Sequence, residues 1–137
     1  MDIEECYSKG FIRKTSIDKE LMKSLVKMSE SKIIAINSAK IDEITISAYV
    51  SMAYDALREI LEAICIGKGY KVTSHQCIGE LLKTITLNFE YVEFDRMRYI
   101  RNGINYYGKE IDLEQGKELL QKILALRVKI KERELKN

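Results

Sequence analysis

The sequence predicts an all-α fold, an antiparallel up-and-down four-helix bundle with one additional short helix. The chain has 137 residues, which is enough for one domain with a single hydrophobic core. Proline is absent, although an average usage of about 5% would give roughly seven in this length, and its absence favours long uninterrupted helices. Apolar residues make up 46% of the chain and recur at helical spacing, separated by the short loops typical of bundles.

The start of the chain shows neither a helical nor an alternating period. We predict a tail or a short packed arm over residues 1–14 and a single bundle domain over residues 15–134. Strand patterns are weak, because the alternation at residues 44–46 continues directly into helical spacing. No strand is therefore predicted.

The first long helix is predicted over residues 17–40. Thr15 or Ser16 supplies its N-cap, and the acidic Asp18 and Glu20 stand in the first turn, where the helix dipole favours them. Its expected buried stripe consists of Leu21, Leu25, Met28, Ala35 and Ala39, widened by Val26, Ile33 and Ile36.

The second long helix is predicted over residues 44–66, with an apolar face wide enough for a central position in the bundle. That face consists of Met52, Ala53, Ala56, Leu57, Ile60, Leu61 and Ile64. Gly67 and Gly69 follow, because glycine past the last turn can close a helix in the left-handed conformation. A phosphate-binding loop is not indicated here, since the P-loop pattern and a preceding strand are both missing.

Three further helices complete the predicted bundle. A short helix begins with an N-cap at Thr73 or Ser74 and carries apolar residues as far as Ile85. A longer helix spans about residues 92–105. The last helix spans about residues 113–134, and its charged end is expected to fray.

Charge and cysteine content narrow the class of protein. The net charge of +2 neither requires nor excludes a polyanionic partner. The acidic first residues and the lack of a long apolar run favour a cytoplasmic protein without a membrane segment. Three cysteines without a CxxC pair predict reduced thiols rather than a disulfide framework.

The single histidine, His75, restricts metal chemistry further. No two-histidine metal site and no histidine relay can form within one chain. A site built from Cys65, His75 and Cys77 lacks the spacing of known zinc sites, so neither a metal nor another cofactor is expected.

Charged residues border the apolar face of the helix predicted at 92–105. At about 100° per residue, Arg101 lies about 40° from Met97, the centre of this face. Asn105 and Arg98 lie at about 80° and about 100°. Desolvating a lone charge costs several kcal/mol, so Arg101 must either pair with an acidic residue or belong to a site. An ion pair with a glutamate at the bundle edge is the simpler interpretation.

Two stretches of the chain carry a family resemblance. Residues 101–108 (RNGINYYG) contain an Arg-Asn pair followed by a short spacer, and residues 49–82 contain an apolar helix, a Gly-Tyr turn and a Ser-His helix start. In this order they resemble the HEPN family, the higher eukaryote and prokaryote nucleotide-binding domains. The resemblance covers roughly residues 16–130 and implies a helical domain that binds nucleotides or RNA.

The resemblance also implies roles for individual residues. Arg101 is expected to hold a phosphate, with Arg98, Asn102 and Asn105 as further nucleotide or RNA ligands. Family members that are metal-independent ribonucleases carry an Arg-x4-6-His motif, whose histidine transfers protons. Tyr106 stands in that place here. Because tyrosine titrates near 10, it suits this task poorly.

His75 is the other candidate for the missing proton-transfer group. Its simpler role is a contact at the start of the short helix, where polar partners are needed. A catalytic role requires that it reach Arg101 across a fold or dimer cleft. Packing against a neighbouring helix is the default expectation for Tyr106. In some toxin members of the family a tyrosine two residues after the histidine accepts a nucleotide, and that position here is Gly108.

Three functions remain open on this basis. The first is a HEPN-like homodimer that binds nucleotides or RNA without efficient catalysis. The second is a metal-independent toxin-type ribonuclease that uses Arg101 with Tyr106 or His75. The third is a structural or adaptor bundle in which Arg101 only forms an internal ion pair. The resemblance further implies a minimal nucleotidyltransferase as a protein partner.

Overall fold

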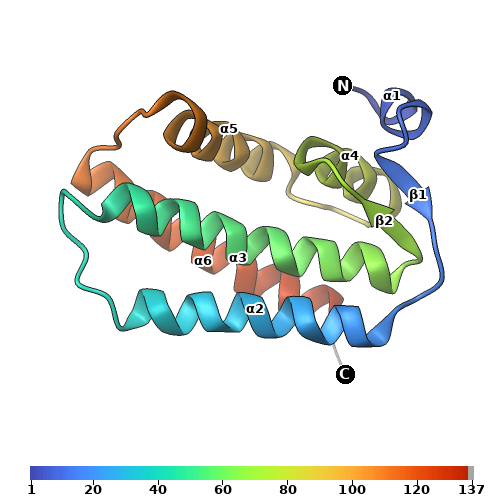
Figure 1. Cartoon of the computed structure of the whole chain (residues 1–137), viewed down its shortest axis with the longest axis horizontal. Coiled ribbons are helices and arrows are strands. Elements are labelled where there is room, and N and C mark those ends of the chain that lie inside the picture. Colours follow the sequence, from blue (N-terminus) through green and yellow to red (C-terminus); the bar gives the residue numbers. More distant parts are fainter. Residues whose placement is uncertain (136–137) are drawn as a thin grey trace.

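The computed structural model describes residues 1–135 and confirms the predicted all-α bundle, with a small two-stranded sheet added. The elements are α1 (Ile3–Ser8), β1 (Ile12–Lys14), α2 (Lys19–Asn37), α3 (Ile46–Gly67), β2 (Tyr70–Val72), α4 (His75–Ile85), α5 (Tyr91–Tyr107) and α6 (Leu113–Glu134). Figure 1 shows that α2, α3, α5 and α6 alternate in direction, as an up-and-down bundle requires. The additional short helix is α4.

Helix α3 lies at the centre of the bundle, as its wide apolar face predicts. It packs against α2, α4, α5 and α6. Most of its length is buried, including Ala53, Tyr54, Leu57, Ile60, Leu61 and Ile64. Gly69 follows the helix with a φ of 87°, which confirms the glycine-based termination. Helix α5 ends in the same way, because its C-cap Gly108 has a φ of 63°.

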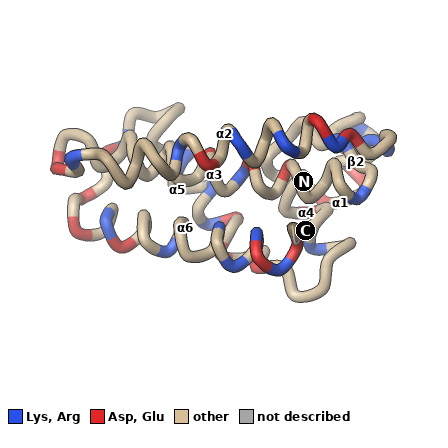
Figure 2. Tube along the Cα trace, turned by 90° about the horizontal axis from the view of Figure 1, so that it is seen from below, with Lys and Arg blue, Asp and Glu red and all other residues tan. Residues whose placement is uncertain are grey.

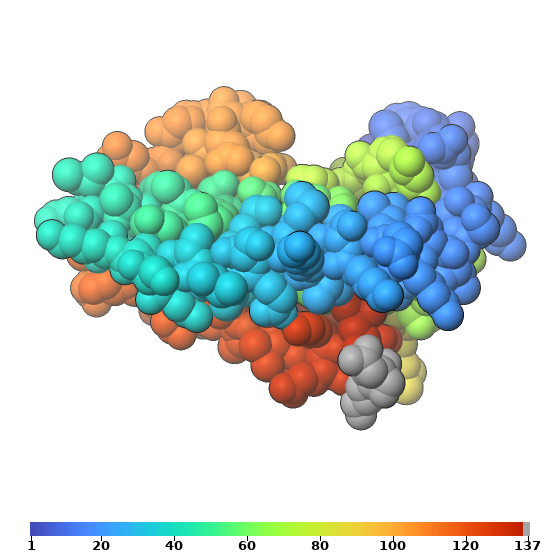
Figure 3. All heavy atoms as spheres, turned by 60° about the horizontal axis from the view of Figure 1, so that its bottom comes forward, coloured from blue at the N-terminus to red at the C-terminus, as the bar shows by residue number. Residues whose placement is uncertain are grey.

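Helix α2 covers α3 with a face that differs from the predicted one. Leu25 and Ile36 are buried as predicted, but Leu21 and Met28 are exposed, and Ser29 is buried in their place. This part of the prediction was wrong because Ser29 interrupts the apolar pattern although its side chain is fully buried. The N-cap was also misplaced, since the Asp18 carboxylate accepts a hydrogen bond from a first-turn backbone N–H at 3.0 Å. Figure 3 shows α2 lying as a band along one face of the molecule.

The predicted arm is ordered and contains structure that the sequence pattern did not indicate. Helix α1 is followed by β1, which pairs antiparallel with β2 in the register Ile12 to Val72 and Lys14 to Tyr70. The prediction of no strand was therefore wrong. Three-residue strands are too short to show an alternating period, and their pairing depends on two segments far apart in the chain.

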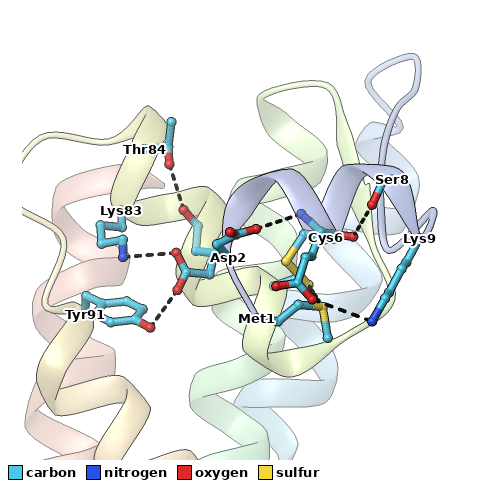
Figure 4. Close-up of a disulfide and its surroundings, with 11 residues drawn as sticks. Met1, Asp2, Cys6, Ser8, Lys9, Lys83, Thr84 and Tyr91 are labelled. Carbon is cyan, nitrogen blue, oxygen red and sulfur yellow. Dashed lines mark hydrogen bonds and ion pairs between the residues drawn. A yellow bond between two sulfur atoms is a disulfide. The ribbon is translucent and has the colours of Figure 1, made fainter.

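A disulfide between Cys6 and Cys77 fastens this arm to the bundle, so the prediction of reduced thiols was wrong. Figure 4 shows the bond joining α1 to α4. The Cα atoms lie 5.8 Å apart, although the residues are separated by 71 positions. That proximity arises only when the β1–β2 pair brings α1 over α4, and no Cys spacing rule anticipates it. Cys65 remains a buried free thiol.

Helix α5 packs on α3 and α4 but stands apart from α6. Between α5 and α6 lies a groove of about 630 Å³ with Met97, Ile100 and Leu119 on its floor and charged residues at its rim. Basic and acidic residues are interspersed along the helices (Figure 2). None of the helices within residues 1–135 combines the length and apolar character needed to cross a membrane.

Candidate functional site

A polar strip on α3 faces α5. Ser51, Asp55, Arg58 and Glu62 follow one another at intervals of four, three and four residues, which places them on one side of the helix. Tyr54 lies beside them and is fully buried. These positions were missed from the sequence, although polar residues at helical spacing within a buried helix were a usable signal. The strip supplies the floor of the candidate site.

Arg101 of α5 joins this strip by a salt bridge to Asp55. Its Nη2 donates to Asp55 Oδ1 at 3.1 Å, and the side chain is only 11% exposed. The predicted pairing of Arg101 holds, but the partner is an aspartate and not a glutamate. The guanidinium also lies over Tyr54, with Cζ 5.5 Å from the ring centroid. An ion pair and a ring face therefore fix the guanidinium together.

The Asn105 amide fixes the other side of the Arg101 guanidinium. In the amide orientation that satisfies both neighbours, Asn105 accepts from Arg101 Nε at 3.0 Å and donates to Ser51 Oγ at 3.0 Å. Asn105 thus bridges α3 and α5. Within residues 1–135 Arg101 Nη1 makes no hydrogen bond, so its N–H groups can donate to a ligand.

Two polar atoms beside Arg101 have no hydrogen-bond partner among residues 1–135. They are the Tyr54 hydroxyl and Arg58 Nε, both buried. Burial raises the pKa of Tyr54 above its ordinary value, so its hydroxyl stays protonated and retains a donor. Arg58 donates instead through Nη1 to Glu62 at 2.7 Å. Arg58 Nε nevertheless lies 3.7 Å from Asp55 Oδ1, so Arg58 and Arg101 share the same carboxylate.

His75 begins α4, and its ring lies next to Tyr54. The two ring centroids are 6.0 Å apart. Burial, together with the positive charges of Arg58 and Arg101, lowers the pKa of His75 to about 4, although the Asp55 carboxylate opposes this shift. The imidazole is therefore neutral near pH 7. The fold brings His75 to the same aromatic ring as Arg101, which the sequence could not show.

The remaining predicted residues divide between this site and its surroundings. Arg98 forms two bonds to Asp95 on its own helix, at 2.9 and 3.1 Å. Tyr106 is 69% exposed, so the expectation that it packs against another helix was wrong. Its ring nevertheless lies 5.9 Å from Arg101 Cζ. Asn102 does not join Arg101 but borders a separate hollow on the outer side of α5.

The charges of the site are closely balanced. Arg58, Arg98 and Arg101 each contact a carboxylate, so an anionic ligand has to compete with these internal pairs. Burial raises the pKa of Glu62, which makes it the carboxylate most easily neutralised. Among residues 1–135, no group of three or more His, Cys, Asp and Glu residues is arranged to hold a metal ion.

Comparisons with protein-family models, curated proteins and solved structures give no match to this chain.

Proposed function

We propose that the chain is a HEPN-like homodimeric protein that binds nucleotides or RNA, with Arg101 as the principal phosphate ligand. The observation that carries this proposal is the position of Arg101. Its guanidinium is held on two sides by Asp55 and Asn105, lies against Tyr54, and keeps Nη1 free. A guanidinium fixed in this way presents the N–H groups of Nη1 to a phosphate without further loss of rotamer freedom.

The neighbouring groups support the same ligand. Arg58 shares the Asp55 carboxylate with Arg101, with its Nε 3.7 Å from Asp55 Oδ1, and so adds a second positive charge next to Arg101. Arg98 adds a positive charge that reaches Tyr54 and His75. Binding of this type weakens with salt, because phosphate contacts release counterions.

A second candidate function is a metal-independent ribonuclease, and the position of His75 favours it. His75 and Arg101 both lie within about 6 Å of the centre of the Tyr54 ring, and a neutral imidazole can take the proton of an RNA 2′-hydroxyl. That oxygen then attacks phosphorus, the bond to the 5′-oxygen breaks, and the exposed Tyr106 hydroxyl near Arg101 gives a proton to the leaving oxygen. Histidine at position 106 would perform this last step better, because its ordinary pKa is closer to neutrality.

The deciding experiment measures binding and cleavage of RNA without metal. We expect the wild-type protein to bind labelled RNA at low salt and Arg101→Ala to weaken binding by about tenfold or more. Arg13→Ala removes one exposed positive charge from β1 and serves as the matched control, with little effect expected. Circular dichroism establishes that each variant folds, and Arg98→Ala gives a second test if Arg101→Ala does not.

Each result selects one function. Cleavage by the wild type that Arg101→Ala and His75→Gln both abolish supports the ribonuclease. Binding without cleavage, together with cleavage by Tyr106→His, supports a phosphate-binding domain that lacks only the proton donor. Absence of RNA and nucleotide binding in the wild type contradicts both and leaves the adaptor function, for which loss of Arg101 lowers stability only.

The homodimer is proposed on the basis of the groove between α5 and α6. Its apolar floor and mixed acidic and basic rim suit a second copy of the same surface. Light scattering at micromolar concentration is expected to give about twice the monomer mass of 15.9 kDa. A monomer mass alone contradicts this part of the proposal. A nucleotidyltransferase partner is tested by co-purification with the chain.

A cytoplasmic location is proposed because RNA is found there. The Cys6–Cys77 bond bears on this location, since cytosolic glutathione keeps most thiols reduced. Alkylation of cell extracts before and after reduction measures which state the protein adopts. Fully reduced thiols in the cell would support a cytoplasmic location, whereas a stable disulfide would support an oxidising compartment.

A further inference from the structure

The outer side of α5 carries exposed aromatic residues, one of which, Tyr106, lies near Arg101. Val92, Tyr99 and Tyr106 recur at seven-residue intervals and so lie along one side of the helix, and Tyr107 stands beside them. Tyr99 is 71% exposed, and the other three are similarly open. We call these four residues the tyrosine face. A gathering of large exposed side chains of this kind marks a binding surface.

The charge of this segment indicates what the tyrosine face binds. Over residues 96–109 the chain contains Arg96, Arg98, Arg101 and Lys109 and no acidic residue. Basic residues interleaved with aromatic ones are typical of nucleic-acid surfaces. Arg98 and Arg101 are already paired with Asp95 and Asp55, whereas Arg96 and Lys109 form no ion pair within residues 1–135 and are the cations available to phosphates.

A hollow adjoins the tyrosine face. Its volume is about 370 Å³, which is in the range of small-molecule sites. It is lined by Tyr99, Ile100, Asn102, Gly103, Ile104, Tyr107, Lys109, Glu110 and Ile111. The two tyrosines offer ring faces for a planar group, and the Asn102 amide offers both a donor and an acceptor for a base edge. This gives Asn102 a role that is separate from the Arg101 phosphate site.

From these observations we infer that the ligand is single-stranded RNA, with unpaired bases stacked on the tyrosine face while Arg101 holds a neighbouring phosphate. This inference rests on the proposed function. Tyr106 connects the two parts, because its ring lies 5.9 Å from Arg101 Cζ. Tyr99 and Tyr106 are two helical turns apart, about 10 Å along the axis, a distance that a few nucleotides span.

Other nucleotide ligands fit this surface less well. In a duplex the base faces are covered by their neighbours and cannot stack on tyrosine side chains. A mononucleotide has one base and cannot occupy Tyr99 and Tyr106 together. A short single strand satisfies both tyrosines and the arginine at once, and stacking tolerates any base sequence.

The test compares a labelled 12-nucleotide single strand with a labelled hairpin of the same composition, each titrated with protein at low salt. We expect the single strand to bind at least about tenfold more tightly than the hairpin. Tyr99→Ala and Tyr106→Ala should each weaken single-strand binding by roughly tenfold and leave hairpin binding unchanged. Tyr7→Ala on α1, where the side chain is also exposed, is the matched control and should change neither.

The outcomes separate this inference from the proposed function. If the wild type binds the single strand and the hairpin equally, and the two tyrosine variants bind as it does, the tyrosine face is not a stacking surface. Sensitivity of both probes to Arg101→Ala then still supports the phosphate site. If the wild type binds neither probe, the proposed function itself fails. Loss of the dimer in Tyr99→Ala, with RNA binding intact, overturns the inference in favour of a protein interface.

Discussion

Ser29 shows how much one buried hydroxyl contributes to this bundle. Its Oγ donates to the Ala56 carbonyl oxygen at 2.6 Å and accepts from Arg127 Nε at 2.8 Å. Three helices, α2, α3 and α6, thereby meet at one atom. Arg127 also donates to Glu30 at 2.8 Å, so its buried guanidinium is charged and bonded on two sides.

Replacing Ser29 with alanine is expected to destabilise the fold by about 2–3 kcal/mol, because a buried charged donor and a carbonyl both lose their partner. The measurement is the free energy of unfolding in urea. Ser31→Ala is the matched control, since that exposed hydroxyl bonds only to the Lys27 carbonyl of its own helix, and a change within about 0.5 kcal/mol is expected. Equal losses in the two variants would contradict the role assigned to Ser29.

His75 makes the stability of the fold depend on mildly acidic pH. Its pKa is about 4 in the folded chain and 6.5 for an ordinary histidine, so between these values the unfolded state binds more protons. The contribution of His75 to stability is therefore complete above pH 6.5 and declines as the pH falls toward 4. The free energy of unfolding in urea, measured for the wild type and His75→Gln at pH 7 and pH 4.5, isolates the contribution of His75.

Between pH 7 and pH 4.5 the wild type is expected to lose more free energy of unfolding than His75→Gln. Other titrating groups, among them Glu62, affect both proteins alike and cancel in this comparison. A wild-type protein that loses no more stability than the variant between these pH values would show that the imidazole is not held neutral by its surroundings.

At the residue scale, the sequence predicts which side chains carry charge into the interior but not their partners. The helical angle of Arg101 relative to Met97 was sufficient to place it at the buried border. Asp55 lies 46 positions away on another helix, and only packing brings it to Arg101. His75 reaches the same site for the same reason. Proximity between elements has no signal in a single sequence.

Among the elements, α6 depends on a close approach to the start of α3. Gly116 is buried, and a Cβ added there would overlap the fully buried Ile46 side chain. Gly116→Ala is expected to lower the free energy of unfolding by about 1–3 kcal/mol through overpacking. The gain in helix propensity offsets part of this loss.

Gly103→Ala on α5 is the natural control for that substitution. A Cβ there meets only the Lys109 side chain at an ordinary 3.5 Å, so helix propensity alone acts and a gain of up to about 1 kcal/mol is expected. Thermal unfolding of the two variants gives the comparison. If both substitutions raised the melting temperature, α6 would be able to move away from α3 without a loss of stability.

The predicted helices agree with the structure where local sequence determines them. The range 113–134 predicted for the last helix coincides with α6, because Asp112 caps it and its apolar spacing is regular. The arm could not be predicted, since α1 and β1 are too short to show a period. Helix α2 was placed correctly along the chain, but its buried face was misassigned because polar Ser29 lies within it.

For the whole molecule, packing around α3 is supplemented by an ion pair that joins the end of α6 to the start of α5. Arg133 near the C-terminal end of α6 donates to both carboxylate oxygens of Glu90, each at 2.9 Å. Glu90 precedes α5, so this pair fixes the entry of the helix that carries Arg101. The hydrogen bonds from Arg133 lower the pKa of Glu90 to about 2, and the pair persists through mild acid.

The bond between Cys6 and Cys77 makes the chain a closed covalent ring with a linear extension. Helices α2 and α3 lie inside the ring, whereas α5 and α6 belong to the extension. Trypsin acting at Lys40, in the loop between α2 and α3, therefore opens the ring without separating any fragment. Cleavage at Lys109, between α5 and α6, releases the last helix outright.

Denaturing gels of a limited digest distinguish the two cuts. The product cut at Lys40 should run as one species without reductant and as two with it, while the product cut at Lys109 should give two species in both gels. In Cys6→Ser the Lys40 product should separate without reductant. Nicked protein thus keeps α2 joined to the segment that carries His75, and a break in the backbone of the ring does not by itself dismantle the site.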